Sequence, residues 1–162
     1  KLGVKNIIML TGDTKQKAEM IANELGIDEV RAELLPQDKA KIVKELMESG
    51  KKVAFVGDGI NDAPALISAH VGISMSRGAD IAKATADISL LKDDIMAVVE
   101  AKEYANKTMN LINNNFNATV GINSCILAGA TFGIFSPIVT AVLHNGTTIG
   151  LLFNSIKGVN IK

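Results

Sequence analysis

The sequence predicts an α/β protein with a doubly wound parallel sheet, followed by a two-helix transmembrane hairpin. Short apolar runs alternate with helical segments over the first part of the chain, which is the pattern of strands and crossover helices in a parallel sheet. Residues 108–156 contain no Asp, Glu, Lys or Arg, which is typical of chain that crosses lipid. We therefore expect three parts: the sheet over residues 1–93, a connecting helix over 94–115 and the hairpin over 116–162.

Charge and cysteine content exclude two classes of protein. Two of the 17 basic residues, Lys157 and Lys162, follow Lys107, so 15 basic residues stand against 17 acidic ones in the earlier segment. A near-neutral segment without a basic stripe argues against nucleic acid as a partner. The lone Cys125 excludes an internal disulfide framework. Because the chain starts at Lys1 and enters a strand almost at once, we expect it to be a piece of a longer protein.

The first strand is predicted over residues 6–10, and the polar string Thr11-Gly12-Asp13 follows at its carboxyl end, ahead of a helix over 15–25. A small hydroxyl and a glycine amide at a helix start suit a phosphoryl oxygen, because free N–H groups and partial positive charge gather there. We take Thr11, Gly12 and Asp13 as candidate phosphate-binding residues. Taken alone, the string is better explained as a helix cap.

A lysine in the second helix carries the next hypothesis. A weaker strand over residues 29–34 is followed by a helix from Pro36 to Ser49 with an apolar stripe that includes Ile42. Lys39 lies three residues before Ile42 and therefore points inward from the first helical turn, where the helix dipole disfavours a cation by about 0.3–1 kcal/mol. We interpret this local conflict as a residue that neutralises bound phosphate. A solvated lysine remains the alternative.

The chain is organised around the string from Gly57 to Leu66, which follows an apolar strand over residues 51–56. Open parallel sheets bind their ligands at the carboxyl ends of strands, which is where Asp58 and Asp62 emerge. Two carboxylates in one tight loop repel each other unless a cation lies between them, and oxygen ligands favour Mg²⁺. We therefore predict a magnesium site at Asp58 and Asp62. The alternative is an ordinary strand-to-helix turn with capping aspartates.

Two further strands, over residues 71–75 and 88–91, flank a short helix over 78–84 and complete the alternating pattern. Asp93 or Asp94 then caps a long helix. Apolar positions continue at helical spacing past the last charge, so we expect this helix to run from water into lipid.

Two uncharged spans over residues 116–135 and 137–156 have about the length that crosses a bilayer, with Ser136-Pro137 as the turn between them. Lysines flank the outer ends and none lies at the turn, so both ends are expected in the cytoplasm. Small residues recur at every fourth position and predict a face for close helix packing: Gly121, Cys125, Gly129 and Gly133. Two buried helices of a water-soluble protein remain the alternative.

Polar side chains inside such spans are costly and therefore mark functional positions. Imidazole is a common transition-metal ligand, and amide, thiol or hydroxyl groups can complete the shell. We take four residues as candidate ligands of a transported cation: Cys125, His144, Asn145 and Thr148. For Asn117 and Asn123 we favour hydrogen bonds between the two helices.

With these residues in view, the chain resembles the P-type cation-transporting ATPases, and among them the heavy-metal branch. Thr11-Gly12-Asp13 resembles the family's Thr-Gly-Asp motif, Pro36-Gln37-Asp38-Lys39 its Pro-x-x-Lys motif, and Gly57 to Leu66 its ten-residue hinge motif. The string His144-Asn145-Gly146-Thr147-Thr148 is similar to the His-x-Gly-x-Thr region of transition-metal exporters, although Asn145 stands where some of them carry a carboxylate. The likeness extends over essentially the whole chain, and a chain end two spans after the hinge motif is similar to the heavy-metal branch.

The resemblance implies an incomplete haloacid-dehalogenase-like phosphorylation domain. By resemblance, the phosphoryl group would be contacted by Thr11, Gly12 and Lys39, beside Asp13, and oriented by Asn61. Mg²⁺ would be held by Asp58 and Asp62. The intact protein would couple ATP hydrolysis to the transport of a divalent or monovalent transition-metal cation through an aspartyl-phosphate. It would be a multi-pass protein of the plasma membrane, with the phosphorylation domain in the cytoplasm and the lipid bilayer as a partner.

What the chain lacks limits these expectations. The family's nucleophile lies in an Asp-Lys-Thr-Gly-Thr motif that is absent from this sequence, as are the nucleotide-binding domain for ATP, the actuator domain and the earlier membrane spans. We expect the chain alone to be inactive, to need the missing amino-terminal part, and to lack a central strand between those ending at Leu10 and Val56. A membrane-anchored Mg²⁺-dependent phosphohydrolase of the same fold and an inactive truncated membrane subunit remain alternatives.

Overall fold

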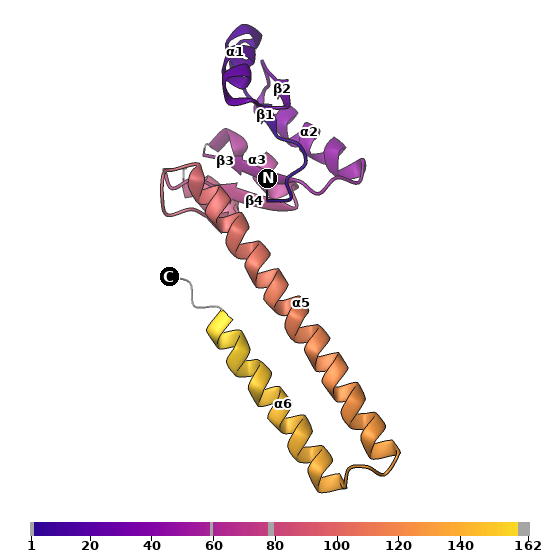
Figure 1. Cartoon of the computed structure of the whole chain (residues 1–162). Helices are drawn as coiled ribbons and strands as arrows, with labels where there is room; N and C mark the ends of the chain where they lie inside the picture. Colours follow the sequence, from indigo (N-terminus) through magenta and orange to yellow (C-terminus); the bar gives the residue numbers. More distant parts are fainter. Residues whose placement is uncertain (1, 59, 78–79, 159–162) are drawn as a thin grey trace. The chain divides into compact units, whose positions relative to one another are not determined.

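The computed structural model describes three stretches of the chain: residues 2–58, 60–77 and 80–158 (Figure 1). Gly59, Gly78 and Lys162, which enter the sequence predictions, lie outside these stretches. The chain divides into two compact units, Lys1–Glu100 and Ala101–Lys162.

The first unit alternates strands with helices, as the sequence predicts. Its elements in chain order are β1 (Ile8–Leu10), α1 (Lys15–Leu25), β2 (Glu29–Arg31), α2 (Pro36–Glu48), β3 (Ala54–Gly57), the 3-10 helix η1 (Ile60–Asp62), α3 (Ala63–Ser68), β4 (Val71–Ser74), α4 (Asp80–Thr85) and β5 (Ile88–Ser89). Strand pairing in the described residues is parallel throughout. The α/β class and every predicted element are therefore confirmed, although the strands are shorter than predicted.

The strands form two separate parallel ladders. β1 pairs with β2 in the register Ile8↔Glu29, and β3, β4 and β5 are neighbours in that order. Among the described residues no pairing joins β1 to β3. Leu10, at the end of β1, nevertheless packs against the core that contains β3. This gap agrees with the expectation that a central strand is missing between those ending at Leu10 and Val56.

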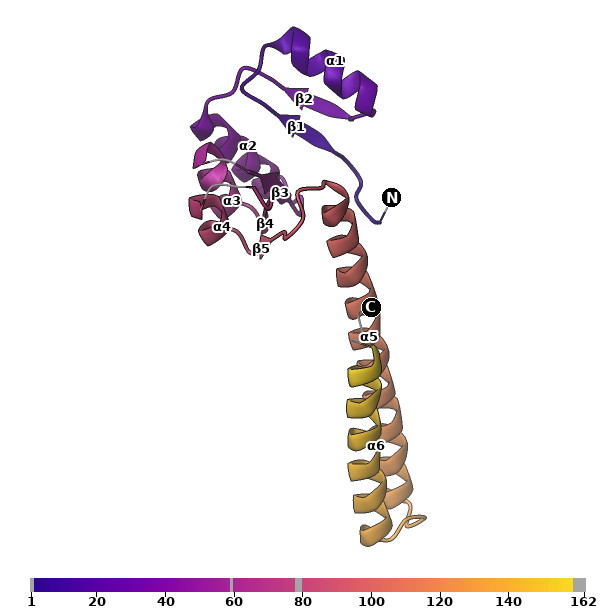
Figure 2. The same cartoon turned by 90° about the vertical axis from the view of Figure 1, so that its left-hand side faces the viewer.

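The core of the first unit lies where α2 and α3 pack beside β3 (Figure 2). Its buried cluster consists of Val43, Phe55, Ala65 and Leu66. Burying a side chain of the size of valine, leucine or phenylalanine contributes about 1.5–3 kcal/mol. Because the cluster joins α2 to α3, it holds the helix that carries Lys39 against the turn that carries Asp62.

Local signals in the sequence set the helix boundaries. Gly26 closes α1 in the left-handed region with φ 64°, and Gly50, with φ 82°, follows the last turn of α2. Pro36 is the first residue of α2, where its missing N–H costs nothing. The backbone N–H of Met96 donates to Asp94 Oδ1 at 2.8 Å, so Asp94 is the cap predicted for the long helix.

The second unit is a helical hairpin. α5 (Met96–Thr131) is one continuous helix of 36 residues, and α6 (Pro137–Gly158) returns beside it after a short connection. Figures 1 and 2 both show the two helices side by side and antiparallel. The predicted pair of helices is therefore present, and the connection between them covers residues 132–136, with Pro137 as the first residue of α6 rather than part of the turn.

No helix in the described part of the chain is both long and apolar enough to cross a membrane. The predicted transmembrane character of the hairpin is therefore not confirmed. The physical reason is the number of amide and imidazole side chains that lower the mean hydropathy of both helices: Asn113, Asn114, Asn115, Asn117 and Asn123 in α5, and His144, Asn145 and Asn154 in α6.

The predicted face of small residues is only partly present. α5 ends at Thr131, so Gly133 lies in the connection, where its φ of 71° suits a turn. A Cβ added at Gly129 would collide with the ring of Phe135, so this glycine accommodates a side chain of its own hairpin rather than another helix. Gly121 alone among the three glycines keeps open space beside it on the helix.

Gly72→Ala tests how closely β4 and α3 approach. The new Cβ would lie 2.7 Å from the carbonyl oxygen of Leu66, a backbone atom that cannot move independently. We expect the variant to lose about 1–3 kcal/mol of unfolding free energy, measured by thermal unfolding of the intact protein. Gly150→Ala is the matched control, because its added Cβ meets nothing within 4 Å. Equal stability of the two variants would contradict the close approach.

Candidate functional site

The Thr11-Gly12-Asp13 string follows β1 and is folded on itself. The Thr11 hydroxyl accepts from the backbone N–H of Asp13 at 3.1 Å and lies 3.3 Å from Asp13 Oδ2. Lys17 Nζ contacts Asp13 Oδ1 at 3.1 Å, one turn into α1. This hydrogen bond, together with the charge of Lys17, lowers the pKa of the exposed Asp13 carboxyl below its ordinary value. Asp13 is thus an ionised residue that orders the loop.

The loop after β2 lies directly on this string. The backbone N–H of Leu34 donates to the Thr11 carbonyl at 3.1 Å, and that of Glu33 donates to the Asp13 carbonyl at 2.9 Å. Glu33 adopts φ 58°, a left-handed conformation that non-glycine residues rarely take. A Cβ at Gly12 would lie 3.3 Å from the Leu34 carbonyl oxygen, so glycine suits this approach. Since α2 begins two residues after Leu34, the contacts tie the string to the helix that carries Lys39.

An ion pair joins α2 to η1. Lys39 Nζ lies 2.8 Å from Asp62 Oδ1, and the two side chains are only 16% and 11% exposed. The predicted inward direction of Lys39 is therefore confirmed. Gly57 makes room for the pair, because a Cβ there would lie 2.7 Å from Asp62 Cβ. Sequence reasoning expected both side chains at the site but did not pair them.

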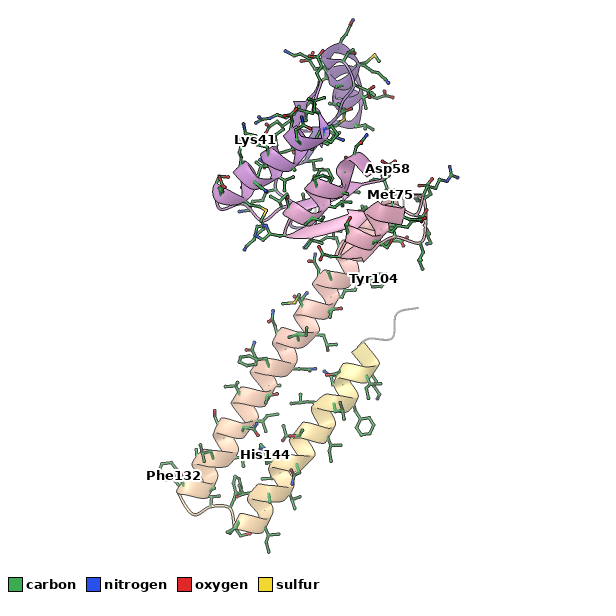
Figure 3. All side chains as sticks on the ribbon, turned by 180° about the vertical axis from the view of Figure 1, so that it is seen from behind. Lys41, Asp58, Met75, Tyr104, Phe132 and His144 are labelled. Carbon is green, nitrogen blue, oxygen red and sulfur yellow. The ribbon has the colours of Figure 1, made fainter. Side chains whose placement is uncertain are left out.

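The two predicted magnesium ligands differ in their surroundings. Asp58 directly follows β3 and is exposed (Figure 3). Asn61 is also exposed, whereas Asp62 is buried and one of its oxygens accepts from Lys39. The described residues contain no cluster of three or more His, Cys, Asp or Glu side chains suited to a metal. Mg²⁺ commonly takes one or two protein carboxylates and completes its shell with water and phosphate oxygens, so this pair of aspartates fits it. Their role as ligands stays a prediction.

The hairpin brings some of the predicted cation ligands together and separates others. His144 and Thr148 lie one turn apart on α6, and the Thr148 hydroxyl donates to the His144 carbonyl at 3.1 Å. His144 Nδ1 lies 3.0 Å from Asn123 Oδ1 on α5 (Figure 3), so the predicted interhelical hydrogen bond of Asn123 is confirmed. Cys125 lines a different, apolar groove beside Gly121 and Leu143.

A second polar contact between α5 and α6 was missed by sequence reasoning. Asn115 Nδ2 donates to Ser155 Oγ at 2.7 Å, and Asn154 Nδ2 donates to Asn115 Oδ1 at 2.7 Å. These polar residues stand in a stretch without charged side chains, where unpaired amides and hydroxyls are costly, and this pattern could have predicted that they pair. The two contacts hold the hairpin near its open end.

Comparisons with known proteins place this geometry in a family. Residues 1–70 match the model of the haloacid dehalogenase-like hydrolases. The chain is 41% identical over 156 residues to a zinc-exporting P-type ATPase of Mycobacterium marinum and 42% identical over 156 residues to a manganese-exporting P-type ATPase of Mycobacterium leprae, with 96% of the chain covered in each case. A crystal structure of a zinc-transporting PIB-type ATPase in the E2.Pi state matches 98% of the chain with 36% identity and a TM-score of 0.88.

The chain is homologous to one segment of the heavy-metal P-type ATPases. It spans about a fifth of the length of the curated relatives, 21% and 22% in the two cases, and 26% of the solved PIB-type ATPase. In this P-type ATPase segment the parallel ladders of the first unit have the haloacid dehalogenase-like fold. The recurrence of the full helical hairpin in the solved relative shows that the two units are found together in the family.

A double-mutant cycle tests the ion pair between Lys39 and Asp62. Lys39→Met and Asp62→Asn each remove one side of a largely buried ion pair, so each is expected to lower the unfolding free energy by about 1–3 kcal/mol. The double variant is expected to lose clearly less than the sum of the two. Thermal unfolding of the intact ATPase measures all three.

Lys41→Met is the control for that cycle. Lys41 lies on the same helix but forms a loose pair with Glu45 at 3.9 Å, with side chains 76% and 55% exposed, so its removal should change stability little. Strict additivity of the Lys39 and Asp62 variants would contradict a coupled pair.

Proposed function

We propose that the chain is part of an ATP-driven transporter of a transition-metal cation that works through an aspartyl-phosphate intermediate. The observation that carries this proposal is the placement of a phosphate-type site and a polar helical hairpin on one chain, joined by the unbroken helix α5. The alternatives are a membrane-anchored Mg²⁺-dependent phosphohydrolase of the same fold, which would need the hairpin only as an anchor, and an inactive truncated membrane subunit. Neither alternative is favoured by a specific contact.

The first unit would bind and neutralise the phosphoryl group. Thr11 and Gly12 supply a hydroxyl and a backbone amide at the end of β1, and Lys39 supplies the positive charge. Asp62 holds Lys39 in a fixed position, which avoids reorganisation at the moment of transfer. Asp13 would maintain the loop through Lys17.

Asp58 and Asp62 would hold Mg²⁺, and Asn61 would orient the phosphoryl group. When bound, this ion neutralises the charge that develops on the transferred phosphoryl oxygens. Asp58 is the more accessible ligand, because Asp62 Oδ1 already accepts from Lys39. The nucleophilic aspartate and the ATP-binding domain would come from parts of the intact protein outside this sequence.

The second unit would lie in the plasma membrane with other helices of the intact protein, leaving the first unit in the cytoplasm. Many large apolar side chains of the hairpin are exposed, among them Phe116, Leu127, Ile138, Val142 and Phe153. Asn115 and Asn154, two of the amide side chains that lower its hydropathy, bond to each other across the two helices, which reduces their cost in lipid. Candidate ligands of the cation remain Cys125, His144, Asn145 and Thr148.

Metal-stimulated ATP hydrolysis by the full-length protein tests the proposal. We expect one of Zn²⁺, Mn²⁺ or Cu⁺ to stimulate the wild type, and His144→Ala to require about tenfold more of that ion for half-maximal stimulation. Asp58→Asn is expected to lower phosphoenzyme formation at least about tenfold without changing the unfolding temperature, because the side chain is exposed. The proposed function would be refuted if no ion stimulated ATP hydrolysis by the wild type, or if Asp58→Asn formed as much phosphoenzyme as the wild type.

A flexible insertion tests whether α5 transmits domain movement as one rigid element. Two glycines inserted after Ala105 lie within α5 and interrupt its helical register. We expect ATP hydrolysis to persist while cation transport into vesicles is lost. Two alanines inserted at the same place are the control, since they shift the register but keep the helix stiff. Coupled transport in the glycine variant would count against the rigid connection.

A further inference from the structure

The two histidines of the chain are held in opposite ways. His144 Nδ1 lies 3.0 Å from Asn123 Oδ1. A carbonyl oxygen of an amide only accepts hydrogen bonds, so this contact is a hydrogen bond in the tautomer with the proton on Nδ1 of His144. His70 Nδ1 instead accepts from the backbone N–H of Val53 at 3.3 Å and must be unprotonated. The neutral His144 ring therefore keeps its free lone pair on Nε2.

Thr148, one turn after His144 on α6, also keeps lone pairs that can accept. The Thr148 hydroxyl gives its proton to the His144 carbonyl at 3.1 Å, so the lone pairs of Thr148 Oγ1 are left to accept. His144 and Thr148 are four residues apart and therefore share a face of the helix. This face presents two neutral atoms with free lone pairs, one nitrogen and one oxygen.

We propose that Asn123 is a positioning residue for the transported cation. It fixes the Nδ1–H tautomer and the orientation of the His144 ring, so that Nε2 binds the metal ion. Metal-binding histidines generally donate their other ring N–H to an oxygen in this way, and loss of that oxygen weakens metal binding by about 10–100-fold. This inference rests on the proposed function, because it assigns a role within its cation path.

The hairpin does not depend on the Asn123 contact for its pairing. Asn115 is bonded to both Ser155 and Asn154 at the open end of the hairpin. α5 and α6 also remain connected through the short turn that precedes Pro137. Removing the Asn123 amide should therefore alter the imidazole without separating the helices.

The test uses the full-length transporter and the ion that stimulates its wild type most strongly among Zn²⁺, Mn²⁺ and Cu⁺. Asn123→Leu removes the acceptor and should raise the ion concentration for half-maximal ATPase stimulation at least about tenfold. Asn123→Asp restores an acceptor and should recover most of that loss. Asn113→Leu, an exposed asparagine on the same helix, is the matched control and should stay within about twofold of the wild type.

Two further measurements separate positioning from a general structural effect. In the His144→Ala background, Asn123→Leu should cause no additional loss, because Asn123 acts through the ring. Nitrogen-15 NMR of histidine-labelled protein, with the His144 signal identified from its loss in His144→Ala, should show Nε2 unprotonated in the wild type and a mixture of tautomers in Asn123→Leu.

Three results would overturn the inference alone: an Asn123→Leu variant with unchanged ion dependence, an Asn123→Asp variant as impaired as Asn123→Leu, or a wild-type ring protonated on Nε2. A wild type stimulated by no ion would overturn the proposed function and this role of Asn123 with it.

Discussion

The ion pair between Lys39 and Asp62 is the constraint on which the site depends. It places a cation in the first turn of α2, where the helix dipole opposes it, and it buries a carboxylate that would otherwise be solvated. The 2.8 Å contact lets each charge offset part of the cost of burying the other. The pair in turn requires glycine at position 57 and the apolar packing of α2 on α3. The chemistry of the loop after β3 is therefore built into the core of the first unit.

Much of the first unit follows from the sequence because its signals are local. Gly26, Pro36 and Asp94 set helix ends within a few residues of themselves, and the absent nucleophile motif predicts the gap between the two ladders. The partner of Asp62 was not predicted, since it lies 23 residues away and two neighbouring carboxylates suggest a cation more strongly than a distant lysine does. Only the packing of α2 on α3 determines that Lys39 reaches Asp62.

For the hairpin, the sequence predicts the two helices but not the contacts between them. Its existence and its turn follow from an uncharged stretch with Ser136-Pro137 in the middle, but its internal bonding does not. Whether polar groups on the two helices meet depends on how each helix is rotated about its own axis, and hydropathy does not specify that rotation. The contacts among Asn115, Asn154 and Ser155 are of this kind. For the same reason the sequence predicts Gly129 on a face for another helix, whereas the ring of Phe135 covers it.

The length of α5 has a mechanical consequence. With 36 residues and a rise of about 1.5 Å each, the helix is about 54 Å long, and its first turn is capped by Asp94. A lever of that length amplifies small rotations: a swing of about 5° at its start displaces the other end by about 5 Å, close to one helical pitch.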